Sequence, residues 1–355
     1  MSHPTARALL AWYAESARDL PWRRRRDPYA IWVAEIMLQQ TRVETVIPYY
    51  ERWLTRFPSI KALAEADTDA VLRHWEGLGY YHRAHHLHKA ARLLVEQHGG
   101  QLPQSIKALE ALPGIGAYTA AAIAALAFDI DAIALDGNLR RVIARILDLD
   151  IDPRLPGGER IIRDWAEAML PKGQASAFNQ ALMDLGATVC LPRAPRCSVC
   201  PIQTGCLAFE RGTQLLRPVR KPKKAIPQYQ VAAGVLIHKG KILLGRRPAD
   251  KLLGGLWEFP GGKQEAGENL ESCLQRELRE ELDVEVKVGL SVGVFAQAYT
   301  HFRVNVHAFY AQILKGEARA LDHSELAWVD PIDFENYPMG KIDRAIARTV
   351  RRDLR

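Results

Sequence analysis

The sequence predicts two architectures in one chain, an all-α portion followed by a compact α+β portion. Three observations support this division. Apolar residues recur at intervals of three and four up to about Phe209, as amphipathic helices require. The basic, proline-punctuated segment 217–227 cannot lie inside a helix and is expected to be a linker. After it, short β-branched runs alternate with turn residues, which is typical of strands.

The composition of the chain favours a polyanionic partner and argues against a membrane protein. The chain has 48 Lys and Arg against 41 Asp and Glu, and the resulting charge of +7 favours a polyanionic partner without identifying one. The longest apolar run, 117–128, is too short to cross a bilayer, and no signal peptide opens the chain. We therefore expect a soluble, cytoplasmic, nucleoid-associated protein, monomeric and without a membrane partner.

Two helical patterns in the first portion are joined by a glycine-containing turn, Leu112-Pro-Gly114-Ile-Gly116. Two glycines in three residues permit a tight turn with outward-facing N–H groups, and the N-terminus of the next helix, at Ala117, also favours an anion. The segment thus favours an anion such as a phosphate, although an ordinary turn between helices would have the same pattern. An aspartate, Asp136, follows twenty residues after Gly116.

Four cysteines fall within one short segment, so their thiolates can surround a single metal centre. They are Cys190, Cys197, Cys200 and Cys206, with the spacing C-x6-C-x2-C-x5-C. Two disulfides are the alternative, which a reducing compartment disfavours. A fifth, distant cysteine, Cys273, is expected in the core. The spacing resembles the [4Fe–4S] loop of the endonuclease III and MutY family of base-excision DNA glycosylases, which implies a [4Fe–4S] cluster on these four residues.

Further segments resemble the MutY group of that family, namely 20–23, 27–29, 32–42, 46–50 and 77–81. The turn at 112–116 is similar to the family's helix–hairpin–helix. The resemblance implies a helix–hairpin–helix glycosylase module over 1–216. Within it a six-helix barrel spans about 23–136, and residues 1–22 with 137–216 form the iron–sulfur cluster domain. A basic linker, 217–228, and a Nudix-like domain, 229–355, would follow.

The family divides into enzymes that only remove a base and enzymes that also cut the strand. Members that cut carry a Lys two residues after the second hairpin glycine, and this Lys forms a Schiff base with the sugar. Here that position is Tyr118, and no Lys occurs from Ala108 to Pro171. The sequence therefore predicts a monofunctional glycosylase.

Removal of adenine asks for two carboxylates, as glycoside hydrolysis does. One must protonate N7 of the base, and the other must stabilise the oxocarbenium ion. The resemblance implies that Glu35, flanked by apolar residues that would raise its pKa, is the acid and that Asp136 faces the cation or traps it. It implies double-stranded DNA with adenine opposite 8-oxoguanine, and also guanine, as substrate. The other implied site residues are Tyr118 and Asn138 beside the carboxylates; Arg18, Trp22, Arg23 and Gln180 in the adenine pocket; and Gln40, Tyr80, Leu112, Gly114, Gly116, Thr300 and His301 on DNA.

In the second portion, the runs 231–237 and 242–245 flank a hairpin signal at 238–241. Two further strands are expected over 286–296 and 303–313. One helix, 269–282, interrupts them, with leucines at every fourth position.

This helix carries most of a Nudix box, in which Asp283 replaces the last Gly. Glu277, Glu280 and Glu281 fall within one arc of the helix, where oxygen ligands could bind Mg²⁺. In the MutY family, however, the Nudix-like domain reads 8-oxoguanine, and Tyr299-Thr300-His301 aligns with the loop that contacts the lesion.

Three alternatives remain at the level of sequence. An endonuclease III-like glycosylase/lyase is opposed by the missing Lys and by the second domain. A nucleotide-pool hydrolase with a DNA-binding appendage is supported by the Nudix box alone. A catalytically inactive iron–sulfur DNA-binding protein is opposed by the presence of both Glu35 and Asp136.

Overall fold

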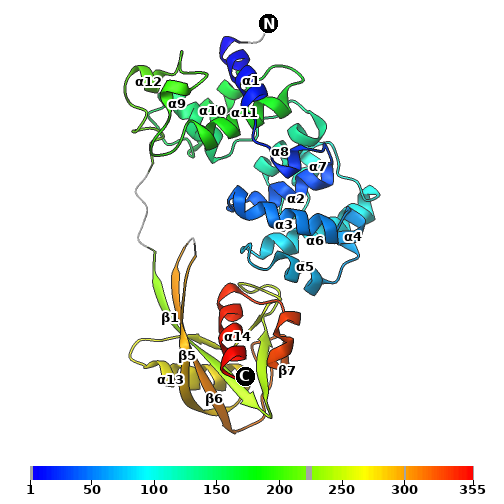
Figure 1. Ribbon diagram of the computed structural model, residues 1–355, viewed down its shortest axis with the longest axis vertical. Coiled ribbons are helices and arrows are strands. Elements are labelled where there is room, and N and C mark those ends of the chain that lie inside the picture. Colours follow the sequence, from blue (N-terminus) through cyan, green and yellow to red (C-terminus); the bar gives the residue numbers. More distant parts are fainter. Residues whose placement is uncertain (1–2, 221–225, 300, 355) are drawn as a thin grey trace. The chain divides into compact units, whose positions relative to one another are not determined.

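The computed structural model describes residues 3–220, 226–299 and 301–354 (Figure 1). The chain divides into two compact units, Met1–Glu65 with Lys89–Lys223, and Ala66–His88 with Lys224–Arg355. Part of the expected linker, 221–225, and Thr300 lie outside the described residues. Across the described ranges, we find no helix that combines the length and the hydropathy needed to span a membrane.

Helices account for the regular structure up to residue 210, as the apolar periodicity predicts. They are α1 (Pro4–Ser16), η1 (Pro21–Arg23), α2 (Pro28–Leu38), α3 (Val43–Arg56), α4 (Ile60–Ala64), α5 (Thr68–Trp75), α6 (His82–His98), α7 (Ile106–Glu110), α8 (Ala117–Phe128), α9 (Gly137–Ile146), α10 (Pro156–Met169), α11 (Ala175–Thr188), η2 (Cys197–Val199) and α12 (Leu207–Glu210).

Helix α2 begins where its sequence dictates. The Asp27 side chain accepts a hydrogen bond from the Tyr29 N–H, and Pro28 occupies the first helical position, where its missing N–H costs nothing. Nine consecutive residues from Tyr29 to Met37 are buried. A helix that is apolar on all sides must lie inside the fold, and α2 therefore carries Glu35 into the interior.

Helices α8 and α9 are also bounded by local signals. Asp129 ends α8 in the left-handed conformation, with φ of 56°. Asp136 caps α9 by accepting a hydrogen bond from the Leu139 N–H at 2.7 Å. Helix α2 packs against α8, α8 packs against α11, and α11 packs against α9. These three contacts bring Glu35, the hairpin before α8 and the start of α9 to one place.

The second unit contains a mixed seven-stranded sheet, with β1 and β6 parallel and the other pairs antiparallel. Its strands are β1 (Gln228–His238), β2 (Lys241–Arg246), β3 (Trp257–Glu258), β4 (Gly261–Lys263), β5 (Glu285–Ala298), β6 (Arg303–Lys315) and β7 (Glu325–Val329), and its later helices are α13 (Leu270–Leu282), η3 (Pro331–Asn336) and α14 (Lys341–Asp353). The strands run in the order β3-β2-β1-β6-β5, while β4 pairs with β1 and β7 with β2.

The expected strands and helix of this portion are confirmed, and the sheet lies between two helices (Figure 1). Along β1, Ala232 and Leu236 pack with α13, whereas Ala233 and Val235 pack with α14, which is the period of two that a pleated strand imposes. Gly234 permits the close approach of α13, because an added Cβ would lie 3.1 Å from the Leu278 side chain.

Candidate active site

A cavity of about 610 Å³ in the first unit is lined by the segment before α2, by α2, by the start of α8, by the start of α9 and by α11. All eight residues predicted for catalysis and for the adenine pocket line it together, namely Arg18, Trp22, Arg23, Glu35, Tyr118, Asp136, Asn138 and Gln180. Two of the predicted DNA-contacting residues, Gln40 and Gly116, line it as well. Residues that are more than a hundred positions apart in the sequence are thus gathered around one opening.

Glu35 lies in this cavity with only 5% of its surface exposed. Burial is the main reason why its pKa rises to about 7, while the hydrogen bond from Tyr118 lowers it and the nearby Asp136 raises it. The Tyr118 hydroxyl donates to Oε2 of Glu35 at 3.1 Å. At neutral pH a substantial fraction of Glu35 is therefore protonated, as a general acid requires.

Asp136 has a different environment, because it caps a helix. Its Oδ1 accepts from the Leu139 N–H at 2.7 Å, and its Oδ2 accepts from Nδ2 of Asn138 at 2.8 Å. Burial raises the pKa of Asp136, and these two donors oppose the rise. Both donors bind the charged form, so they favour the carboxylate.

A hydrogen-bonded chain connects Asp136 to the cysteine segment. Arg141 donates to Oδ1 of Asn138 at 2.9 Å and to the carbonyl of Cys190 at 2.9 Å. The same guanidinium donates to the carbonyl of Gly186 at 2.6 Å. Arg141 therefore fixes Asn138 against α11, and Asn138 in turn orients Asp136.

The two arginines of the cavity converge on one buried carboxylate, Asp184. Arg18 donates to it through its backbone N–H at 3.1 Å and its Nε at 2.6 Å, and Arg23 donates through both terminal nitrogens at 2.7 and 3.0 Å. Burial alone would raise the pKa of Asp184, but the bonds from Arg23 and Arg18 hold it below its usual range. Asp184 thus positions both side chains.

The predicted DNA-contacting residues are distributed between the two units. Gln40, in the first unit, and Tyr80, in the second, both adopt left-handed backbone conformations, with φ of 59° and 49°. Such conformations are unusual for residues other than Gly, and they cluster at functional sites.

The hairpin before α8 holds Gly114 at φ of 78°, a conformation that favours Gly. Gly116 caps α8, and an added Cβ there would meet no atom within 4 Å, so packing does not explain this glycine. Leu112 is buried, with 6% of its surface exposed.

The four predicted metal ligands line one hollow beside α9. Cys190, Cys197, Cys200 and Cys206 are free thiols, without the disulfides of the alternative hypothesis. Arg145, which is almost fully buried, donates to Sγ of Cys190 at 3.3 Å. Within the described ranges, His, Cys, Asp and Glu side chains form no group of three or more arranged to hold a metal ion.

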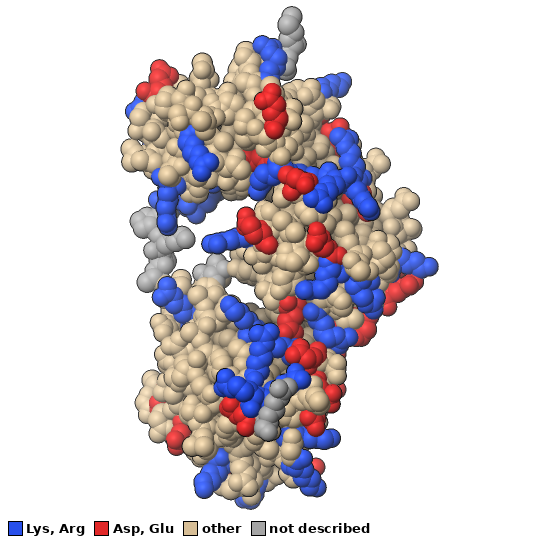
Figure 2. Space-filling model, viewed as in Figure 1, with Lys and Arg blue, Asp and Glu red and all other residues tan. Residues whose placement is uncertain are grey.

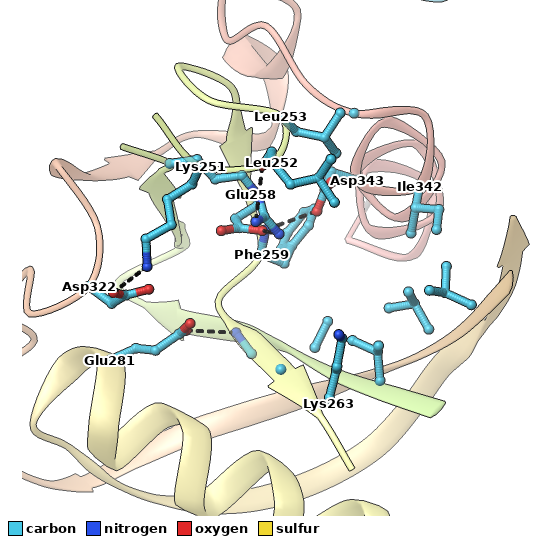
Figure 3. Close-up of a pocket in the computed structure, with 18 of the residues that line it drawn as sticks. Lys251, Leu252, Leu253, Glu258, Phe259, Lys263, Glu281, Asp322, Ile342 and Asp343 are labelled. Atoms are coloured by element: carbon cyan, nitrogen blue, oxygen red, sulfur yellow. Dashed lines mark hydrogen bonds and ion pairs between the residues drawn. The ribbon is translucent and has the colours of Figure 1, made fainter. Parts of the chain in front are cut away.

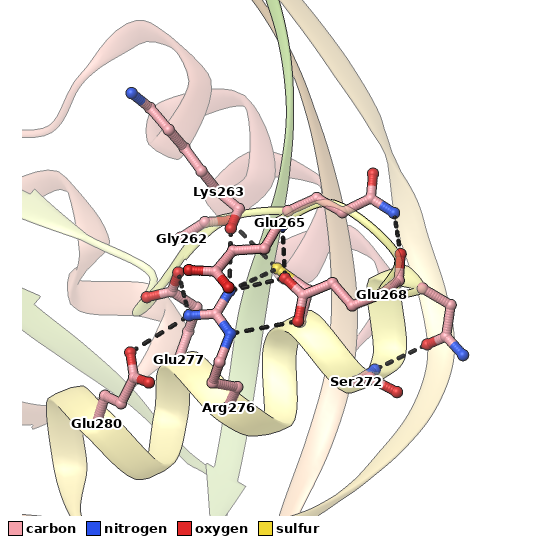
Figure 4. A network of polar contacts seen from close by, with 11 residues as sticks. Gly262, Lys263, Glu265, Glu268, Ser272, Arg276, Glu277 and Glu280 are labelled. Atoms are coloured by element: carbon pink, nitrogen blue, oxygen red, sulfur yellow. Dashed lines mark hydrogen bonds and ion pairs between the residues drawn. The ribbon is translucent and has the colours of Figure 1, made fainter.

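The Nudix-box segment forms a compact polar network (Figure 4). Arg276 donates to Glu268 at 2.7 Å, to Glu277 at 3.0 Å and to Glu280 at 3.3 Å. Glu281 accepts from the Gly261 N–H at 3.0 Å. The carboxylates therefore stabilise the turn before α13, and the geometry gives the Mg²⁺ hypothesis no support.

Two other features of this portion bear on the sequence expectations. Asp283, at the position of the last Gly of the box, ends α13 at φ of 59°, which explains why Gly is favoured there. Cys273 is fully buried, as expected. His301 is exposed, and the Tyr299 ring stacks on Phe302 with centroids 4.7 Å apart.

Comparisons with known proteins agree with this geometry. Residues 33–166 match the model of the HhH-GPD superfamily of base excision DNA repair proteins, and 232–349 match the NUDIX domain. An adenine DNA glycosylase of Buchnera aphidicola subsp. Baizongia pistaciae is 37% identical over 254 residues, which cover 71% of this chain and 72% of the relative. The chain belongs to the adenine DNA glycosylase family. The expected resemblance is thereby confirmed.

Other relatives and solved structures match this chain over part of their length or at lower identity. The enzyme of Rattus norvegicus is 37% identical over 326 residues, 77% of this chain, and the chain spans only 63% of that relative's length. A thermostable thymine-DNA glycosylase structure has 31% identity and a TM-score of 0.54, and covers 58% of this chain and 95% of its own. A non-covalent endonuclease III–DNA complex, at 19% identity and a TM-score of 0.51, covers 59% and 95% and supports the helical fold alone.

Two residues of this adenine DNA glycosylase family member, Asp184 and Arg141, were not found from the sequence. Both lie in helical segments whose periodicity explains them as ordinary polar positions. The available signal was that Asp184 is on the buried side of α11, four residues from Gln180. A charged residue at a buried helical position needs a partner of opposite charge. Arg18 and Arg23, predicted for the same pocket as Gln180, were the available partners for Asp184.

Proposed function

We propose that this member of the adenine DNA glycosylase family removes adenine from duplex DNA in which the adenine is paired with 8-oxoguanine, or with guanine. One observation carries the proposal. The same cavity holds a carboxyl group that is substantially protonated at neutral pH, Glu35, and a carboxylate bound by two donors, Asp136. This is the division of roles that cleavage of a glycosidic bond requires.

In this mechanism the adenine leaves the base stack and enters the cavity. Glu35 transfers its proton to N7, so that the bond between C1′ and N9 breaks and neutral adenine departs. Asp136 faces the resulting oxocarbenium ion and stabilises its positive charge. Water then adds to C1′, and its proton passes to Glu35, which restores the acid for the next reaction.

The cavity also supports a monofunctional reaction. Among the described residues that line it, none is a lysine, so the amine needed for a Schiff base with the sugar is not supplied there. Tyr118 occupies the place of that Lys. Burial raises the pKa of its phenol well above the usual value, which keeps it a hydrogen-bond donor rather than a nucleophile.

We assign the cysteine hollow to a [4Fe–4S] cluster. The four thiols line one hollow beside α9, and four thiolates from one segment can together hold such a cluster. A cluster held by Cys190, Cys197, Cys200 and Cys206 would supply structural order between α11 and α12. Measurement of iron and acid-labile sulfide in the purified protein, with Cys197→Ser alongside, tests this assignment.

Binding to DNA is supported by charge near this loop. Arg193 and Arg196 are exposed between the first two cysteines. Figure 2 shows Lys and Arg side chains gathered on the lower edge of the part that carries α9 and α12. Contacts of this kind position a duplex through its phosphates without reading its sequence. We expect a monomer to bind DNA in this way, and light scattering of the free protein would establish the stoichiometry.

We assign recognition of 8-oxoguanine to the segment 299–301, in which His301 is exposed. His301→Ala should lower the rate on adenine opposite 8-oxoguanine more than the rate on adenine opposite guanine. Asp333→Asn, an exposed substitution elsewhere in the same unit, is the matched control. Equal losses on both substrates would exclude a role for His301 in reading the lesion.

The decisive experiment uses a duplex with one adenine opposite 8-oxoguanine. Strand cleavage is read with and without hot alkali, for the wild type and for Glu35→Gln. Cleavage by the wild type only after alkali supports the proposal. Cleavage without alkali would revive the glycosylase/lyase alternative. Wild-type activity retained by Glu35→Gln would remove Glu35 from the mechanism, and inactivity of the wild type would overturn the proposed function.

A further inference from the structure

One loop of the second unit is held by residues that are far from it in the sequence. The loop, 76–81, lies between α5 and α6, and the segment 66–88 that contains it belongs to the same compact unit as residues 224–355. Three of its residues have positive φ, namely Gly77 at 100°, Gly79 at 72° and Tyr80 at 49°. For Tyr80, which is predicted to contact DNA, this conformation is strained, so the surrounding contacts must maintain it.

Part of this support is local and comes from Arg83, a buried residue of α6. Its side chain donates to the carbonyls of Leu78 and Gly79 at 3.2 and 3.1 Å. Its guanidinium lies 5.1 Å from the centroid of the Trp75 ring and 5.4 Å from that of Tyr80. Arg83 therefore stabilises the middle of the loop, but it does not connect the loop to the rest of the second unit.

The start of the loop is anchored by the C-terminal part of the chain. Arg344, on α14, donates to both oxygens of Glu76, through Nε at 2.5 Å and through Nη2 at 2.9 Å. The Met339 N–H donates to the same carboxylate at 3.2 Å. Arg344 is buried and also donates to the carbonyls of Phe334 and Tyr337, so its guanidinium has a fixed orientation. A bidentate pair of this kind sets direction as well as distance.

The end of the loop is anchored on the same part of the chain. The Tyr81 hydroxyl donates to the carbonyl of Met339 at 3.1 Å and accepts from the Gly77 N–H at 3.3 Å. Met339 thus holds Glu76 through its N–H and Tyr81 through its carbonyl. A displacement of Met339 and α14 would therefore move both ends of the loop that carries Tyr80.

The first turn of α14 has a second set of neighbours. Ile342 and Asp343 line a cavity of the second unit (Figure 3), and Tyr299 lines the same cavity. The next residue along the helix, Arg344, holds Glu76. One end of α14 is therefore shared by the surroundings of the segment 299–301, which we assigned to reading 8-oxoguanine, and by the loop 76–81.

We propose that Arg344 is a positioning residue for Tyr80. It acts through Glu76, and together with Met339 it holds the loop 76–81 in the conformation in which the Tyr80 ring can enter a base stack. A side chain inserted into a stack offsets part of the cost of unstacking, and the adenine must leave the stack before it can react. The inference rests on the proposed glycosylase function, to which it adds a connection between the lesion-reading part of the chain and the opening of the duplex.

The first experiment reads insertion of Tyr80 without base removal, because every protein in it also carries Glu35→Gln. The duplex has adenine opposite 8-oxoguanine, with 2-aminopurine next to the 8-oxoguanine, and the fluorescence of 2-aminopurine rises when it is unstacked. The increase at saturating full-length protein is compared for the parent, Tyr80→Ala, Arg344→Gln and Arg348→Gln. Arg348 is exposed and lies one turn further along α14, so it is the matched control.

We expect the fluorescence increase to be lost in Tyr80→Ala, largely lost in Arg344→Gln and unchanged in Arg348→Gln. Because the increase is read at saturation, a change in affinity alone does not alter it, and circular dichroism establishes that each variant is folded. Tyr81→Phe removes one hydroxyl, should lose part of the increase, and decides the test if Arg344→Gln does not fold. No increase with the parent, or the parent's increase in both folded variants, would overturn the proposal.

Single-turnover rates of base removal, measured with Glu35 present, distinguish positioning from a general loss of structure. Arg344→Gln should lower the rate by about tenfold or more, since one misplaced group can cost that much. In Tyr80→Ala the same substitution should change the rate by less than about twofold, because the side chain through which it acts is already absent. Equal losses in the presence and absence of Tyr80 would overturn the proposal. A wild type that removes no adenine would overturn the proposed function, whereas the fluorescence result would stand.

Discussion

The phenol of Tyr118 donates a hydrogen bond to Oε2 of Glu35, with the two oxygens 3.1 Å apart. The two residues come from helices that pack against each other, α8 and α2. Burial raises the pKa of Glu35 to about 7, and this hydrogen bond lowers it. Tyr118 therefore helps to determine how much of the acid is protonated at neutral pH.

Replacement of Tyr118 by Phe should shift the pH dependence of base removal. The proposed reaction requires protonated Glu35, so the single-turnover rate should fall as pH rises through about 7. Without the hydrogen bond the pKa of Glu35 rises further, and the alkaline limb should move up by about one pH unit. The measurement is the single-turnover rate between about pH 5.5 and 9. Tyr49→Phe, on α3, is the control, and an unmoved limb in Tyr118→Phe would refute the coupling.

The raised pKa of Glu35 also has a consequence for stability. In the folded state the carboxyl binds a proton up to about pH 7, whereas in the unfolded state it loses the proton near 4.5. The unfolded state thus binds fewer protons between these values, so stability falls as pH rises through this window. Full loss corresponds to about 3 kcal/mol.

Glu35→Gln cannot ionise, so it should be more stable than the wild type at pH 8 by up to about 3 kcal/mol. The difference should vanish near pH 4.5. Urea unfolding at both pH values measures it, with the exposed Glu15→Gln as control. A gain of stability that is the same at both pH values would mean that ionisation of Glu35 is not its cause.

Much of this structure follows from local sequence. The limits of α2 follow from Asp27 and Pro28, and the strands β1 and β2 follow from two apolar runs around a turn in which Lys239 and Gly240 both have positive φ. The gathering of Glu35, Tyr118 and Asp136 was expected only through resemblance, because no short-range pattern fixes how α2, α8 and α9 pack.

The site residues that were not predicted from the sequence, Asp184 and Arg141, act through tertiary contacts. In the sequence, Asp184 looks like an ordinary polar residue of α11. In the structure, Arg18 and Arg23 donate hydrogen bonds to it. Arg141 likewise gains its partners from Gly186 and Cys190, more than forty positions away.

Asp283, which ends α13 in the left-handed conformation, predicts that a Gly variant is more stable than an Ala variant at this position. Asp283 has φ of 59°, where Gly is unstrained and a residue with a Cβ costs about 1 kcal/mol or more. Asp283→Gly should therefore preserve or slightly raise the thermal stability, and Asp283→Ala should lower it. At Glu280, inside the same helix, Ala should be more stable than Gly. The same order at both positions would contradict the strain at Asp283.

Removal of the Asp184 carboxylate should disturb the positions of Arg18 and Arg23, which line the active-site cavity. Asp184→Asn leaves the Arg18 and Arg23 guanidiniums without their buried counter-charge, and loss of one member of such a group costs about 3–5 kcal/mol. We expect a lower midpoint of thermal unfolding and weaker binding of adenine in the cavity. Differential scanning fluorimetry and single-turnover kinetics measure the two effects. The exposed Asp164→Asn, on α10, should change neither, and wild-type stability of Asp184→Asn would show that the arginines find other partners.

Arg141 offers a test of whether the cysteine segment supports catalysis. Its guanidinium joins Asn138 to the carbonyl of Cys190, and Asn138 donates to Asp136. Arg141→Gln should therefore allow Asp136 to lose its orientation and lower the rate of base removal by about tenfold or more, since one misplaced group can cost that much.

The neighbouring Arg140 is the matched control, because it is on the same helix but pairs with Glu159 at 2.9 Å. Arg140→Gln should leave the single-turnover rate within about twofold of the wild type, as expected for a partly exposed pair. The affinity for duplex, measured in parallel, separates a defect in chemistry from one in binding. If Arg141→Gln loses affinity and keeps its rate, the arginine serves the DNA-binding loop and not Asp136.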